Sequence, residues 1–206
     1  MTRRGRAAKV ADEARRGRAA LGARLRARVL IDPASVLKLP KDVVADPRHD
    51  GVVSLLASHA GPLWEGGKNQ VPALPMTEAL GAALRAALAA GHACQGLELI
   101  TDKLAGEQKG LDALRDKAPE SPQNARASRI LFLANDGSTR FYRDADALLS
   151  RYAQRVLGCR LEIAGEALGE ALLGSPKMVR SVLVFDKKAA ARALLSLLPP
   201  PPPPSA

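Results

Sequence analysis

The sequence predicts an α/β fold: a three-layer α-β-α sandwich around a small, mostly parallel sheet, with an extended basic N-terminal arm and a proline-rich C-terminal tail. Beyond residue 76, segments with helical periodicity alternate with short apolar runs in the order α-α-β-α-β-α-β-α. Such alternation is typical of a largely parallel sheet that helices cover. The run at 130–134 is continuously apolar, which indicates a strand buried on both faces.

Capping residues and helical spacing predict the first helices after residue 76. Thr77 is a good N-cap for a helix whose leucines recur at helical spacing until Gly91. A second helix is expected over 97–104 and a short third one around 111–114. Prolines and polar residues at 119–124 indicate an exposed loop after them.

The last third of the chain alternates cleanly between helices and strands. Each helix is preceded by a turn or capping residue, and glycines separate the elements. In chain order we expect a helix whose apolar stripe runs to Val156 and stops at Gly158, a strand at 159–163, a helix at 166–173, a strand at 179–185 and a final helix capped by Asp186.

Positive charge is concentrated at the N-terminus. The formal net charge of the chain is +10, and residues 1–30 carry ten basic and two acidic side chains, a net +8. Small Ala and Gly residues separate the arginines, so this arm cannot bury enough apolar surface to fold alone. We expect it to neutralise RNA phosphates. The arm residues expected to bind RNA are Arg3, Arg4, Arg6, Arg15, Arg16, Arg18, Arg24 and Arg26.

Composition divides the chain into four expected parts. A basic arm, disordered or ordered by RNA, covers 1–30, and a poorly defined extension covers 31–75. The α/β domain covers 76–198. A tail at 199–206 begins with six prolines, which favour an extended polyproline II conformation.

Several classes of protein are not expected. No stretch approaches 18 apolar residues without charge, so no membrane span is expected. The histidines and the two cysteines lack metal-ligand spacing, and no nucleotide-binding glycine motif is present, so we expect no metal, cofactor or catalytic residue. Aromatic residues make up only 3% of the chain, which argues against stacking of bases on several rings. Arg140, Arg143, Arg151 and Arg155 are interpreted as the solvated face of one helix.

Three motifs follow one another in the order of a known family. Residues 90–98 read as helix–Gly–strand–Gly–helix, 130–138 as a long strand and an acidic turn, and 168–174 as a glycine-containing helix end before the strand around 182–184. Together they resemble the L-seven-Ae/L-thirty-e superfamily of ribosomal and kink-turn-binding proteins over about residues 78–198. The resemblance implies RNA binding at one end of an α-β-α sandwich.

Carried over by position, the RNA-binding residues that the resemblance implies are Gly96, Glu98 and Lys103 on one side and Lys177 and Arg180 on the loop opposite. Glycine lets backbone N–H groups approach phosphate, and the basic side chains add charge at the rim. We therefore expect a non-enzymatic RNA-binding protein, a component of a ribosome (mitochondrial or cytoplasmic) or of another ribonucleoprotein. Its expected partners are rRNA and neighbouring subunits.

Two alternatives stay open. The arginine-rich arm also suits an organelle transit peptide, and Glu98, Leu99 and Asp102 stand where kink-turn readers carry Asn, Glu and Lys. The first alternative is therefore an organelle-targeted structural protein without kink-turn readout. The second is a small α/β enzyme that uses Asp136, which follows the carboxyl end of a strand, where such enzymes place active residues. A turn capped by Ser138 explains the same residues.

Overall fold

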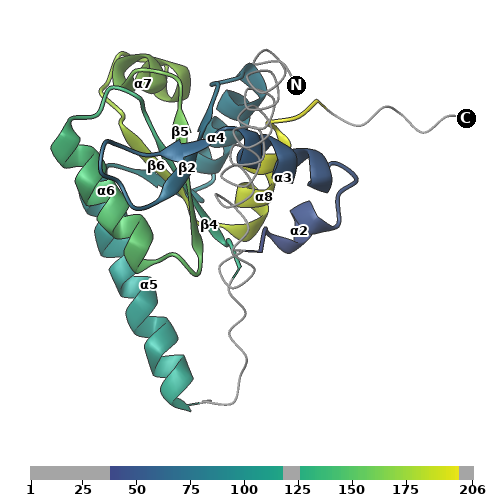
Figure 1. The fold of residues 1–206 in the computed structure, drawn as a ribbon, viewed down its shortest axis with the longest axis vertical. Helices are drawn as coiled ribbons and strands as arrows, with labels where there is room; N and C mark the ends of the chain where they lie inside the picture. The colour runs from purple at the N-terminus through teal and green to yellow at the C-terminus, as the bar shows by residue number, and fades with distance from the viewer. Residues whose placement is uncertain (1–37, 118–125, 200–206) are drawn as a thin grey trace, which may run out of the picture. The chain divides into compact units, whose positions relative to one another are not determined.

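The computed structural model describes residues 38–117 and 126–199, which all belong to the unit Leu37–Ala206. The basic arm and nearly all of the proline tail lie outside these residues. The described residues form an α/β fold with seven helices and one six-stranded sheet (Figure 1). In chain order the elements are α2 (Lys41–Val44), α3 (His49–Ser58), β1 (Ala60–Pro62), β2 (Gln70–Leu74), α4 (Glu78–Ala89), β3 (Ala93–Gln95), α5 (Leu97–Lys117), β4 (Arg129–Leu133), α6 (Thr139–Arg151), β5 (Val156–Leu161), α7 (Gly165–Leu173), β6 (Ser181–Val184) and α8 (Lys187–Leu195).

The sheet is mixed, so the prediction of a mostly parallel sheet is wrong. The strand order is β1-β2-β5-β4-β6-β3. Strand β5 pairs in parallel with β2 and β4, whereas β6 runs antiparallel to both β4 and β3, and β1 runs antiparallel to β2. The physical reason for the error is that an apolar strand buried on both faces has the same residue pattern in either direction.

Residues 38–75, part of the segment that the sequence left poorly defined, contribute strands to the sheet. They contribute two helices and two strands, and Leu74 of β2 pairs with Leu161 of β5. The strands are short, and Pro72 lies within β2 beside the three-residue edge strand β1. Proline normally argues against a strand, which explains why the sequence pattern is weak here.

The expected helix ends are largely confirmed, with two differences. Thr77, Ser138 and Asp186 each accept a hydrogen bond from the first turn of the helix that follows. The segments expected at 97–104 and 111–114 are one helix, α5. Gly158 does not end α6 but lies inside β5, where an added Cβ would come 2.6 Å from Cδ1 of Leu149. A larger residue at 158 would thus require the Leu149 side chain of α6 to move.

Two apolar cores lie against the opposite faces of the sheet. Along β4, Ile130 and Phe132 belong to one core and Leu131 and Leu133 to the other, as the alternation of side chains in a strand requires. Helices α4, α7 and α8 contribute to the first core, and α5 and α6 to the second (Figure 1). Helices and strands thus contribute side chains to each of the two cores.

A buried carboxylate fastens the connection between β1 and β2 to α6. Asp146 is 6% exposed and accepts hydrogen bonds from the backbone N–H groups of Lys68 and Asn69, each at 3.1 Å, and from Nδ2 of Asn69 at 2.8 Å. Burial alone would raise the pKa of Asp146, but these hydrogen bonds outweigh it and lower the pKa below its ordinary value of 3.8.

The substitution Asp146→Asn should weaken the domain at neutral pH. The amide nitrogen of Asn would face N–H donors, so we expect a loss of about 1–3 kcal/mol in the free energy of unfolding. Because the lowered pKa stabilises the fold above pH 3.8 and this contribution disappears as pH falls toward the folded-state pKa, the variant should also lose less stability on acidification. Urea unfolding at several pH values measures both effects. The exposed Asp144→Asn is the control, and equal behaviour of the two variants would contradict the assignment.

Two helical glycines should respond oppositely to alanine. Gly110 in α5 has open space where a Cβ would lie, so Gly110→Ala should raise the free energy of unfolding by about 0.5–1 kcal/mol. At Gly169 in α7 a Cβ would overlap the carbonyl of Lys177, and Gly169→Ala should lower it by at least about 2 kcal/mol. Chemical denaturation compares them, and a stabilised Gly169→Ala variant would show that the loop at Lys177 is not packed as described.

Candidate nucleic-acid interface

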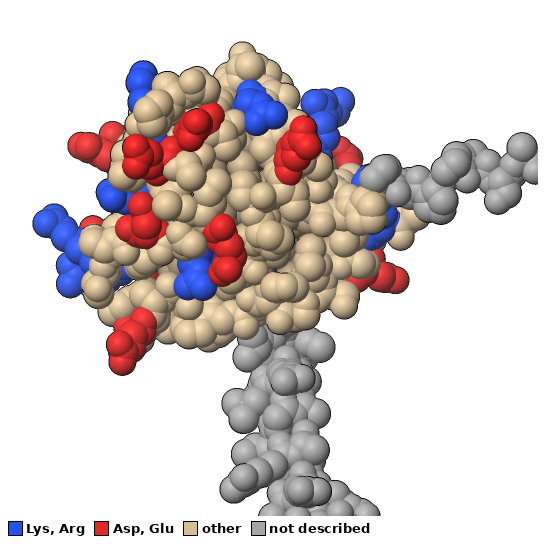
Figure 2. Space-filling view, turned by 90° about the horizontal axis from the view of Figure 1, so that it is seen from above, with Lys and Arg blue, Asp and Glu red and all other residues tan. Residues whose placement is uncertain are grey.

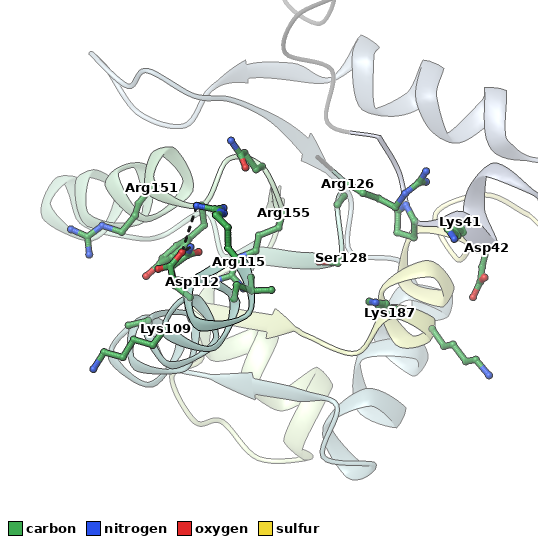
Figure 3. A pocket seen from close by; sticks show the side chains of 18 residues that line it. Lys41, Asp42, Lys109, Asp112, Arg115, Arg126, Ser128, Arg151, Arg155 and Lys187 are labelled. Atoms are coloured by element: carbon green, nitrogen blue, oxygen red, sulfur yellow. Dashed lines mark hydrogen bonds and ion pairs between the residues drawn. The ribbon is translucent and has the colours of Figure 1, made fainter. Parts of the chain in front are cut away.

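A basic groove of about 1170 Å³ lies at the end of the sheet where β4 and β5 begin. Helices α5 and α6 form one wall, and α2 and the start of α8 form the other. In Figure 3, Lys109 and Arg151 lie on one side and Lys41 and Lys187 on the other, with Ser128 between them. We call this feature the basic groove. Its basic lining residues are Lys41, Lys109, Arg115, Arg126, Arg151, Arg155, Lys187 and Lys188.

The strand directions bring these residues together. Strands β4 and β5 are parallel, with Arg129 opposite Val156, so the residues that precede both strands emerge at the same end of the sheet. Strand β6 is antiparallel to β4, so the start of α8 arrives at that end as well. The floor between them is held by backbone hydrogen bonds from Ala127 to Lys38 at 2.7 Å and from Ser128 to Arg155 at 2.9 Å.

Charge separates sharply between the groove and the remaining surface. The groove is lined by eight basic and two acidic side chains, the latter being Asp42 and Asp112. The other described residues carry 13 basic and 15 acidic side chains. The positive charge of the described domain is therefore concentrated in this one concave region, where low-dielectric walls strengthen its field.

Two cations on the floor are fixed by the protein itself. The Arg155 side chain is 12% exposed, and it donates to Glu107 at 3.0 Å and to the carbonyl of Leu104 at 2.9 Å. Burial lowers the pKa of Arg155, and the nearby Glu107 carboxylate partly offsets this. Arg126 donates to the carbonyl of Leu39. These guanidinium groups make the floor positive but already use part of their hydrogen-bonding capacity.

The cations on the walls are more available. Lys41, Lys109, Arg151, Lys187 and Lys188 are exposed, and none forms an ion pair with another residue of the described ranges. Arg115, also exposed, lies 3.8 Å from Asp112. Five exposed ammonium and guanidinium groups thus surround a floor that is itself positive. This arrangement suits an anionic ligand that contacts several cations at once.

Three of the residues that the family resemblance implied lie together at the opposite end of the sheet. Gly96, Lys177 and Arg180 line a small pocket of about 190 Å³. Glu98 is exposed outside it, and the ammonium of Lys103 lies 3.7 Å above the ring of Phe185. The implied arginines of the arm lie outside the described residues.

This opposite end has no comparable concentration of cations. Arg180 is paired with Asp136 at 3.6 Å. Figure 2, which views the domain from the α7 end of Figure 1, shows acidic and basic side chains intermingled. Ser138, near Asp136, accepts a hydrogen bond from the N–H of Phe141 and caps α6. Both side chains therefore have structural partners.

Cys159 is fully buried, which raises the pKa of its thiol to about 12, and burial also raises the pKa of Cys94. Within 38–117 and 126–199, no group of three or more His, Cys, Asp or Glu residues is placed to hold a metal ion. No helix in the same ranges is both long enough and apolar enough to cross a membrane.

No protein-family model and no curated protein sequence matches the chain.

The basic groove is a site that sequence reasoning missed. Arg151 and Arg155 were interpreted as the solvated face of one helix, but α6 ends at Arg151 and Arg155 directly precedes β5. A signal was present, because Arg126, Arg155 and Lys187 each stand within three residues of the end of a strand. These positions indicate a shared groove only when the direction of β6 is known, and the sequence does not reveal that direction.

Glu107 should be essential for the order of the groove floor. Its carboxylate is 3.0 Å from Nε of Arg129 and 3.0 Å from Nη1 of Arg155. Glu107→Gln would leave two half-buried guanidinium groups without a counter-charge, and we expect the free energy of unfolding to fall by about 1–3 kcal/mol. Asp102→Asn, exposed on the same helix, should change it by less than about 0.5 kcal/mol. Thermal or urea unfolding compares the two, and an equal effect would contradict the proposed role of Glu107.

Proposed function

We propose that this protein binds RNA through the basic groove and acts as a non-enzymatic component of a ribosome, mitochondrial or cytoplasmic, or of another ribonucleoprotein. The observation that carries the proposal is the separation of charge in the described domain. Eight basic and two acidic residues line the groove, whereas acidic residues outnumber basic ones in the rest of the described domain. A cationic groove of this kind is the electrostatic footprint of a polyanion.

A polymer suits the groove better than a small phosphate compound does. The exposed cations belong to four helices and stand on two walls, and the floor arginines already donate to protein carbonyls and to Glu107. A single phosphate would meet only a few of these groups. A chain of phosphates can contact cations on both walls at the same time, and each neutralised phosphate adds affinity by releasing counterions.

Two further observations favour RNA as the polyanion. Residues 1–30 carry ten basic side chains, enough to neutralise several more phosphates. The motif order over about 78–198 resembles the L-seven-Ae/L-thirty-e superfamily, whose members bind RNA with an α-β-α sandwich. We propose that the described domain has this three-layer arrangement, that the arm adds sequence-independent affinity, and that Gly96, Lys177 and Arg180 form at most a secondary contact.

Three charge-reversed double variants of the full chain test the proposal. Lys109→Glu/Lys187→Glu changes one cation on each wall of the groove, Lys177→Glu/Arg180→Glu changes the opposite end of the sheet, and Arg140→Glu/Arg143→Glu is a matched control on α6. The readout is affinity for a folded RNA hairpin as a function of salt, by fluorescence anisotropy. The groove variant should bind at least about tenfold more weakly, with a slope of log K against log salt that is shallower by about 2 units.

The control variant should stay close to the unmodified protein. Equal losses in the groove and control variants would show that binding depends on net charge alone and not on the groove. A loss confined to Lys177→Glu/Arg180→Glu would place the interface at the opposite end of the sheet. Circular dichroism of each variant confirms that the fold is retained.

A further inference from the structure

The basic groove offers no ring on which a base can stack. All six aromatic residues of the chain fall within the described ranges, and Tyr152 alone among them lines the groove. Tyr152 is 5% exposed, and the guanidinium carbon of Arg155 lies 5.0 Å from its ring centroid. Because the ring is buried and Arg155 lies against it, a base cannot stack on Tyr152.

Without stacking, the charged groups on the walls supply the main contacts. Lys109 and Arg151 line one side of the groove, and Lys41 and Lys187 line the other (Figure 3). Lysine ammonium groups act as point charges that suit phosphate oxygens rather than the base edges. The floor contributes its fixed positive charge through Arg155. These contacts carry little information about base sequence.

We infer, building on the proposed function, that the basic groove takes the sugar–phosphate backbone of base-paired RNA and does so independently of base sequence. Single-stranded RNA must be ordered when it binds, and proteins that bind single strands normally offset this cost by stacking bases on aromatic rings. The basic groove lacks such rings. A base-paired helix presents phosphates that are already ordered, and its higher charge density gives a larger release of counterions for each contact.

The experiment compares paired and unpaired RNA on the full chain. The probes are two RNA duplexes of about 20 base pairs with unrelated sequences, together with single strands of the same length that do not self-pair. A triple variant, Lys109→Gln/Arg151→Gln/Lys187→Gln, removes one groove cation from each of α5, α6 and α8. The matched triple Arg140→Gln/Arg143→Gln/Arg192→Gln removes the same charge at exposed positions outside the groove. The loss caused by the groove variant isolates the contribution of the groove from that of the basic arm.

The groove variant should lose at least about tenfold in affinity for both duplexes and less than about threefold for the single strands. The two duplexes should be bound within about twofold of each other, since backbone contacts do not read sequence. An equal or larger loss for single strands would overturn the inference while leaving RNA binding by the groove intact. A preference of more than about tenfold for one duplex would also overturn it, because that requires base readout. No loss for any probe would overturn the proposed function itself.

Discussion

Burial of the central strand on both faces is the constraint on which the rest of this structure depends. Every side chain from Ile130 to Ala134 is 0% exposed, and each contacts one of two helix-covered cores. Burying a large apolar side chain contributes about 1.5–3 kcal/mol, whereas an unpaired charge buried there would be strongly destabilising. Cations are thereby excluded from this stretch of β4. The basic groove lies instead at the end of the sheet where β4 and β5 begin.

Strand direction then decides which cations meet. Strand β4 pairs in parallel with β5, and β6 runs antiparallel to β4. The starts of β4 and β5 and the end of β6 therefore lie at the same end of the sheet. Glu107 reduces the repulsion between positive groups packed closely there, because its carboxylate lies 3.0 Å from both Arg129 and Arg155. One carboxylate shared by two guanidinium groups leaves the cluster with net positive charge and gives each guanidinium a charged hydrogen-bond partner. The floor can thus be both ordered and cationic.

The sequence could predict the local elements but not how they assemble. Capping by Thr77 and Asp186 and the buried strand at 130–134 depend on neighbouring residues, so local patterns are enough to find them. The place of residues 38–75 in the sheet depends on pairing between Leu74 and Leu161, which no local pattern contains. The groove depends on long-range pairing even more, because its cations come from separate segments between Lys41 and Lys188. Only the strand order and directions reveal that they share one cavity.

Negative charge outside the groove matters as much as the positive charge within it. With 13 basic and 15 acidic side chains, the remaining described surface offers a polyanion no net attraction, and its acidic residues repel phosphate locally. A ligand steered by this field would approach the end of the sheet where β4 and β5 begin, rather than the α7 end where the charges are intermingled (Figure 2). A uniformly basic surface would attract RNA equally from all sides. The observed distribution instead favours one orientation of docking on a polyanion.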